Sequence, residues 1–247
     1  MQADPAAQLR LLDVAALDTQ ASQLQHRKKT LPEHATIAEL MVQRTRLSEA
    51  LVGASTELGD AETELARLET DLTPARARLD RNQTRVNDGS VTDAKALRGM
   101  LDEIDHLRGR ISTLEDQELD IMQAIEDATA ARDKVIQTRT ELDGRIRALM
   151  AKRDSQLADL DAELAERSTQ RAALVALIPA DLIALYDKVA ARNGARGAAE
   201  IKARRCSGCQ LDIHPSDISR FGSASPDEVL RCEQCDRILV RTAESGL

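Results

Sequence analysis

The chain has 247 residues and a formal net charge of -8, and it contains no Trp, one Tyr and one Phe. So few bulky side chains cannot fill a thick globular core, whereas small apolar residues set among 31% charged residues are typical of long paired helices. The negative charge argues against nonspecific nucleic-acid binding by the whole molecule. No apolar leader follows Met1 and no run reaches about 18 apolar residues, so we expect a cytoplasmic protein without a membrane partner.

The first half of the chain carries an apolar repeat of seven residues, and the second half carries a matching one. Two such series predict helices that pack along a continuous seam, as in a coiled coil. The first series is Leu51, Leu58, Leu65, Leu72, Leu79 and Val86, and the second is Leu107, Leu114, Ile121, Ala128, Val135, Leu142 and Leu149.

The segment Asn87-Asp88-Gly89-Ser90 separates the two series. Glycine favours the left-handed conformation that ends a helix, and the following Thr92-Asp93 can cap the next helix. We therefore predict a reversal near residues 87–91, which makes the two helices antiparallel. A turn centred near residue 90 places Leu72 near Arg108.

Two prolines interrupt the first arm. Pro32 removes a helical hydrogen bond and disfavours helix at the preceding residue, which predicts a break near residues 30–32. A separate N-terminal helix then runs from about Ala6 to Lys29 and lies against residues near 151–174. Its predicted inward residues are Val14, Leu17, Ala21 and Leu24. Pro74 predicts a kink or a local break rather than a stop, because the heptads resume at Leu79.

The pattern changes after residue 178. Pro179 opens a short helix that Asn193-Gly194 closes, and strand-like runs such as Arg237-Ile-Leu-Val follow. The sequence therefore predicts a mostly α protein, with a long antiparallel coiled-coil hairpin over residues 1–178. A short helix and a small β-rich four-cysteine zinc ribbon occupy residues 179–247.

All four cysteines lie in two CxxC pairs, Cys206 with Cys209 and Cys232 with Cys235. Each pair forms a tight knuckle, and two knuckles supply the four thiolates that one structural Zn²⁺ accepts in a tetrahedron. Four thiolates leave no open position for water, so hydrolytic zinc chemistry is not expected. Two redox dithiols or an iron-sulfur site are the alternative. His214 follows the first knuckle but is not expected to be a ligand, because the set is already complete.

The motifs resemble those of bacterial C4-type zinc-ribbon proteins that have a long N-terminal helical hairpin. The matching features are the Leu31-Pro32 break, Gly89-Ser-Val-Thr-Asp, Gly197-Ala-Ala-Glu-Ile before Cys206-Ser-Gly-Cys, and Cys232-Glu-Gln-Cys followed by Asp-Arg-Ile-Leu. Two positions depart from this pattern. Asp236 stands where relatives often have Gly, and Val240 stands where an aromatic residue is common. The resemblance implies binding roles, because some relatives are linked to flagellar or type III secretion export and to RNA or sigma-factor contacts.

The ribbon is the only part of the chain where we predict a nucleic-acid face. Residues 192–241 contain nine basic and seven acidic residues, a net charge of +2. The candidate contact residues for nucleic acid or another partner are Lys202, Arg204, Arg205, Arg220 and Arg237. Four thiolates around Zn²⁺ carry a formal charge of -2, which cancels the basic excess, and a single Phe offers at most one stacking surface.

No catalytic constellation and no phosphate-binding glycine loop is present, so we expect neither an enzyme nor a small-molecule substrate. The preferred hypothesis is a non-enzymatic zinc-binding adaptor or chaperone-like scaffold, which binds partner proteins through its coiled coil and its ribbon. An RNA- or DNA-binding regulator that uses the ribbon is the alternative, and a thiol-redox-sensitive holdase is a third.

Overall fold

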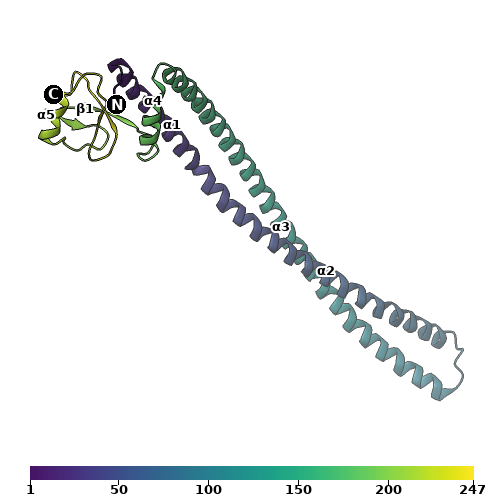
Figure 1. Ribbon diagram of the computed structural model, residues 1–247. Coiled ribbons are helices and arrows are strands. Elements are labelled where there is room, and N and C mark those ends of the chain that lie inside the picture. The colour runs from purple at the N-terminus through teal and green to yellow at the C-terminus, as the bar shows by residue number, and fades with distance from the viewer. The chain divides into compact units, whose positions relative to one another are not determined.

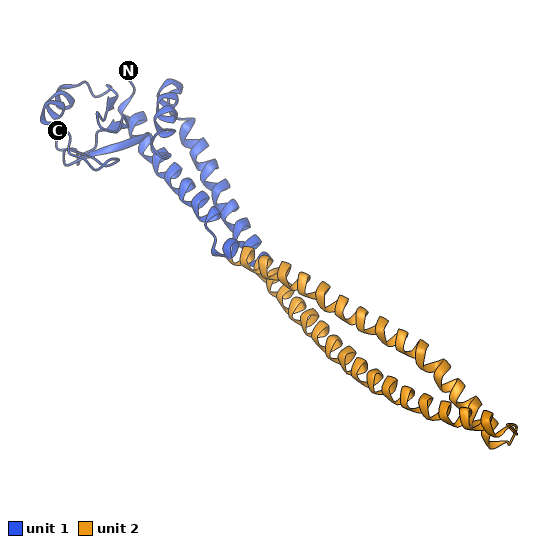
Figure 2. Cartoon of the chain, turned by 90° about the horizontal axis from the view of Figure 1, so that it is seen from below, with its two compact units in different colours: residues 1–35, 150–247 blue, residues 36–149 orange.

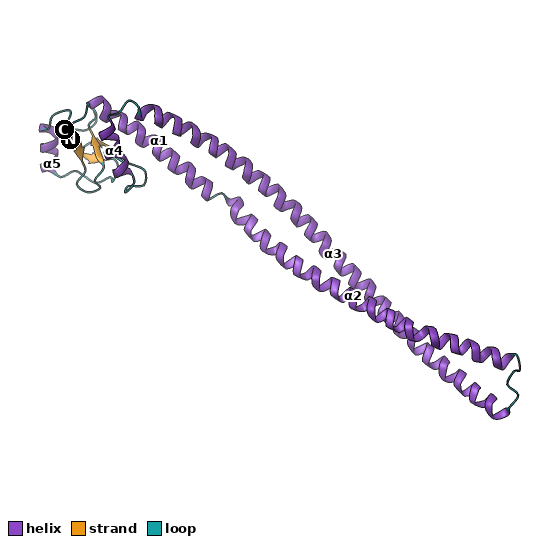
Figure 3. Cartoon of the chain, turned by 45° about the vertical axis from the view of Figure 1, so that its right-hand side comes forward, coloured by secondary structure: helices purple, strands orange, loops and turns teal.

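The computed structural model describes residues 1–247 and confirms the predicted fold class (Figure 1). The helices are α1 (Pro5–Lys29), α2 (Pro32–Asn87), α3 (Ala94–Val175), α4 (Ala180–Ala190) and α5 (Pro215–Ser223). The strands are β1 (Ala198–Lys202), β2 (Arg205–Cys206), β3 (Leu230–Arg231) and β4 (Ile238–Val240), all in the C-terminal part of the chain (Figure 3). None of the five helices combines the length and the apolar character needed to cross a bilayer.

The chain forms two compact units (Figure 2). Unit 1 comprises residues 1–35 and 150–247, and unit 2 comprises residues 36–149. This division differs from the predicted one at residues 178/179. The reason is that α1 packs against the C-terminal strands, so the N-terminal helix shares a core with the ribbon.

Unit 2 is an antiparallel pair made by residues 36–87 of α2 and residues 94–149 of α3. Every residue of the two predicted heptad series is buried or half-buried. One apolar cluster joins Leu68 and Leu72 of α2 to Ile111 of α3, and a second joins Leu40 to Ile146. Arg108, the residue expected near Leu72, is exposed, and Ile111, three residues further along α3, shares the cluster with Leu72. Leu114 and Ile121 of α3 pack against the same cluster.

The chain reverses between α2 and α3 through residues 88–93. Gly89 has a φ of 72°, which is the left-handed conformation that a glycine adopts without strain. The carboxylate of Asp93 accepts a hydrogen bond from the N–H of Ala96, so it caps α3. Pro74 does not stop α2, which continues to Asn87, whereas α1 and α2 are separate helices with Thr30 and Leu31 between them.

In unit 1 the four strands form one sheet in the order β2-β1-β4-β3. The central strands β1 and β4 are parallel, with Ala198 opposite Ile238, and the two outer pairings are antiparallel. Side chains of β4 alternate between the two faces, because successive residues of a strand point to opposite sides. Ile238 and Val240 pack against α1 and α4, whereas Leu239 packs toward Phe221 and the cysteines.

The N-terminal residues are tied to the ribbon by backbone hydrogen bonds. The Ala3 N–H donates to Asp227 O at 2.7 Å, and the Val229 N–H donates to Met1 O at 3.0 Å. Leu11 and Val14 of α1 are fully buried in the same cluster as Ile238. The ribbon sheet therefore depends on α1 for one of its two cores.

Candidate metal centre

The two CxxC knuckles have the same backbone geometry. In each, the residue after the second cysteine donates its N–H to the carbonyl of the first cysteine, at 2.8 Å in both cases. That residue is Gln210 in the first knuckle, with a φ of 60°, and Asp236 in the second, with a φ of 61°. Asp tolerates the left-handed conformation, so the knuckle forms with Asp236 at the position where the resemblance led us to expect Gly.

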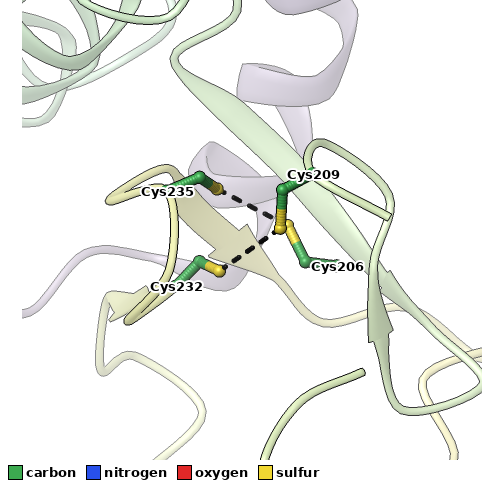
Figure 4. A group of neighbouring side chains, drawn as sticks. All are labelled: Cys206, Cys209, Cys232 and Cys235. Carbon is green, nitrogen blue, oxygen red and sulfur yellow. Dashed lines mark hydrogen bonds between the residues drawn. The ribbon is translucent and has the colours of Figure 1, made fainter. Parts of the chain in front are cut away.

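The four cysteine side chains point toward one another from the two knuckles (Figure 4). Their sulfur atoms all lie within 4.8 Å of one another. The Cys206 and Cys235 Sγ atoms are 3.9 Å apart, as are those of Cys209 and Cys232. A tetrahedral zinc ion with Zn–S bonds of about 2.3 Å requires sulfur separations of about 3.8 Å, which the two 3.9 Å separations match, so this donor set fits Zn²⁺.

Burial disfavours charge on these sulfurs when no cation is nearby. It raises the pKa of the Cys206 thiol to about 12, although backbone N–H groups of Cys209 and Gly208 oppose the rise. Burial also raises the pKa of Cys232. For Cys235, burial is outweighed by hydrogen bonds from the backbone and side chain of Arg237, which lower the pKa. Zn²⁺, when bound, supplies the positive charge that holds all four groups as thiolates.

Arg237 connects the second knuckle to the loop after α4. Its guanidinium donates to the carbonyls of Arg196 at 3.0 Å and Asn193 at 3.1 Å. A Cβ built at Gly208 in the first knuckle would lie 2.6 Å from Arg237 Cδ, so only glycine fits beside this side chain. Arg237 therefore links both knuckles and the loop after α4.

The other predicted contact residues also bond to the ribbon itself. Lys202 pairs with Glu244 at 2.7 Å, and Arg205 pairs with Asp212 at 2.9 Å. Arg204 donates to Gly246 O at 2.9 Å. Arg220 pairs with Asp217 and Glu233 and lies 5.1 Å from the centre of the Phe221 ring. All five basic side chains thus have intramolecular partners; four of them are exposed, whereas Arg237 is half-buried.

His214 serves as a helix cap. Its Nδ1 atom accepts a hydrogen bond from the Ser216 N–H at the start of α5. The side chain also contacts the Ser216 hydroxyl at 2.7 Å. The four cysteines form a complete cluster without it.

Two sets of residues that support the fold around the site were not predicted from the sequence. Arg241 donates to the carbonyls of Ala224, Ser225 and Glu228, and so fixes the loop that leads from α5 to β3. Asp18 accepts from the Tyr186 hydroxyl at 2.8 Å and from Arg171 Nε at 2.6 Å. Arg171 follows Leu157 and Leu164 at sevens, so a charge at an apolar heptad position was the available signal for this network.

Comparison with known proteins agrees with this architecture. A family model described as the CT398-like coiled coil hairpin domain matches residues 14–194, and a C4-type zinc ribbon domain model matches residues 205–239. The protein Rv2229c of Mycobacterium tuberculosis is 29% identical over 241 residues, which cover 98% of each chain.

Solved structures show the same fold. One from Mycobacterium smegmatis is 32% identical, with a TM-score of 0.86, and the match covers 98% of this chain and 100% of that chain. CT398 of Chlamydia trachomatis has a TM-score of 0.69 over 96% of this chain and 98% of its own, but at 17% identity it shows the fold alone. The long helical hairpin, the four-cysteine ribbon and these matches together place the chain in the CT398-like coiled-coil hairpin family with a C4-type zinc ribbon.

Proposed function

We propose that this protein is a non-enzymatic, zinc-binding adaptor or scaffold, which binds partner proteins through its coiled coil and its ribbon. A coiled-coil hairpin and a zinc ribbon fit a scaffold-like protein. In this proposal one Zn²⁺ per chain, held by the four cysteines, has a structural role, because a closed four-thiolate site offers no position to a substrate.

The main support for the proposal is that the five basic side chains of the ribbon already have hydrogen-bond or ion-pair partners within the chain. Lys202, Arg205 and Arg220 each pair with a carboxylate, and Arg204 and Arg237 donate to backbone carbonyls. A phosphate group would have to compete with these partners. This favours protein over nucleic acid as the ligand, since phosphate contacts from Lys and Arg supply most nonspecific nucleic-acid affinity.

RNA or DNA binding by the ribbon is the second candidate, and the local net charge of +2 over residues 192–241 is what favours it. The full chain is the proper material for the test, because α1 completes the ribbon's core. Binding of labelled single-stranded RNA and duplex DNA is measured at about 0.15 M salt, for the wild type and the K202A/R204A/R205A variant.

We expect weak binding that the three substitutions change little. Tight binding that the variant loses, with a steep dependence on salt, would overturn the order of the two candidates. Tagged protein recovered from cells and treated with nuclease is expected to keep specific protein partners. If no protein is retained, the scaffold proposal fails.

A further inference from the structure

The negative charge of the molecule is concentrated in the middle of unit 2. Residues 57–71 of α2 and 115–127 of α3 contain twelve acidic residues and one basic residue, Arg67, whereas the whole chain has a net charge of only -8. We call these two segments the acidic belt. Its carboxylates are Glu57, Asp60, Glu62, Glu64, Glu69, Asp71, Glu115, Asp116, Glu118, Asp120, Glu126 and Asp127. The rest of the chain is therefore positive overall.

The two segments of the belt face each other across the hairpin. Leu68 and Leu72 of α2 share a cluster with Ile111, and Ile121 packs against that cluster. Arg76 reaches across to Glu115 at 2.8 Å and to Glu118 at 3.6 Å. The carboxylates of both segments thus lie on one stretch of the helical pair.

Ion pairs between α2 and α3 flank the belt but do not occur along most of it. Arg44 pairs with Asp143 on one side, and Arg76 pairs with Glu115 at the other margin. Apart from the second contact of Arg76, with Glu118, no ion pair joins the helices between these two bridges, and the only ion pair between two belt residues is the local Arg67–Glu64 contact. Antiparallel coiled coils normally place opposite charges at these flanking positions.

The heptad spacing identifies which residues stand where basic side chains would be expected. Moving by sevens from Arg76 along α2 gives Glu69 and Glu62, and moving by seven from Glu115 along α3 gives Met122. Because the helices are antiparallel, these residues occupy the same flank of the hairpin. An exposed methionine therefore stands where a basic partner of Glu69 would be expected.

An apolar patch lies within the belt. Leu119 is 65% exposed and Met122 is 47% exposed. Leu119, Met122 and Glu126 are spaced i, i+3 and i+7, so they share one face of α3. Large apolar side chains bracketed by unpaired carboxylates form an unpartnered helix face.

We propose that this face of the acidic belt docks a basic amphipathic helix from a partner protein. Apolar side chains of that helix cover Leu119 and Met122. Its lysines or arginines pair with Glu62, Glu69 and Glu126. Charge complementarity selects this occupant, since the three carboxylates are exposed and have no ion pair within the chain. The same charge repels nucleic acid. The inference rests on the proposed function and names its surface and its class of partner.

The test uses full-length, zinc-loaded protein and a labelled helical peptide of about 21 residues, with leucine at the a and d positions and lysine elsewhere. Fluorescence anisotropy measures its affinity for the wild type, for the belt variant E62K/E69K/E126K and for the apolar variant L119Q/M122Q. The matched control E39K/D102K/E141K changes three exposed carboxylates of unit 2 outside the belt, with the same change in net charge.

We expect the belt variant to weaken binding by at least about tenfold, the control by less than about twofold, and the apolar variant by about fivefold. Equal losses in the belt and control variants would overturn the proposal, because net charge alone would then explain binding. No loss in L119Q/M122Q would also overturn it. Light scattering supplies a further check: a wild-type dimer that the belt variant dissociates would mean that a second copy covers this face.

The failure of this proposal can be told apart from failure of the scaffold function. If the belt variant retains the same nuclease-resistant partner proteins as the wild type, the belt is not the docking surface but the scaffold function stands. If the wild type retains none, the scaffold function itself fails.

Discussion

At the scale of single residues, Tyr186 is the most informative side chain. It is fully buried, and its hydroxyl donates to the Asp18 carboxylate at 2.8 Å. We expect Tyr186→Phe to lower the free energy of unfolding by about 2 kcal/mol at pH 7, because hydrogen bonds to charged groups contribute about 1.5–3 kcal/mol. Urea denaturation followed by circular dichroism measures the difference.

The same variant has a predictable pH dependence. Burial, followed by the hydrogen bond to Asp18, raises the pKa of Tyr186 above its ordinary value of 10.0. A raised folded-state pKa means that the stability from this group is fully present below pH 10.0 and is lost at higher pH, where the unfolded state ionises first. The wild-type advantage over Tyr186→Phe should therefore shrink as pH rises above 10. A difference that stays constant from neutral pH upward would contradict this assignment.

Gly197 is a second test at this scale. A Cβ at this position would lie 2.5 Å from Tyr186 O and 2.7 Å from Tyr186 Cδ2. We expect Gly197→Ala to destabilise unit 1 by about 1–3 kcal/mol, the usual effect of overpacking. Since the chain has a single Tyr and no Trp, the fluorescence of Tyr186 follows the unfolding of this unit selectively.

Gly109 provides the matched control, because nothing lies within 4 Å of a Cβ built there in α3. Gly109→Ala should be neutral or stabilise the helix by about 0.5–1 kcal/mol. Similar losses in both variants would show that the close approach at Gly197 is not what matters.

At the scale of elements, the knuckles make a prediction about metal. Wild-type protein should contain about one zinc per chain by elemental analysis, and Cys206→Ser should lose most of it. Because the clusters of unit 2 contain no ribbon residue, the helical circular dichroism signal should change little. His214→Ala is the control and should keep its zinc. Zinc loss in the His214 variant, or retention in the Cys206 variant, would contradict the ligand set.

Elements set by local spacing were predictable from the sequence. The heptads of α2 and α3 and the turn residues at Gly89 specify their own structure, because short-range periodicity and backbone preference determine them. The CxxC knuckles are similar, since both ligands of each pair lie within one turn. The pairing register also follows from the position of the turn: Leu72 was expected near Arg108, and Ile111, three residues further along α3, shares its cluster.

Contacts between distant segments were not predictable in the same way. Packing of α1 on β4, and the Asp18–Tyr186 hydrogen bond, join residues more than 160 positions apart. The sequence of α1 does not encode which surface will cover its apolar side chains. The partners of the basic ribbon residues were equally unpredictable. The sequence shows that Arg237 is positively charged, but it does not show that the carbonyls of Arg196 and Asn193 accept its hydrogen bonds.

At the scale of the whole molecule, the four-cysteine site and the acidic belt lie in different units. Unit 1 contains the four-cysteine site and the basic side chains that bond to its own ribbon. Unit 2 contains the acidic belt, with exposed Leu119 and Met122. In the proposed scaffold, zinc would stabilise the ribbon and the hairpin would offer its acidic belt to basic protein partners.

Site-specific photo-crosslinking in living cells distinguishes protein docking on the acidic belt from RNA binding by the ribbon. A photoreactive phenylalanine replaces Leu119 in one strain and Arg204 in another, and crosslinked protein and RNA are quantified for each. We predict a discrete crosslinked protein from position 119, which is lost when Glu62, Glu69 and Glu126 are changed to Lys. We predict only background RNA from position 204. Abundant RNA at position 204, with no protein at position 119, would contradict both predictions.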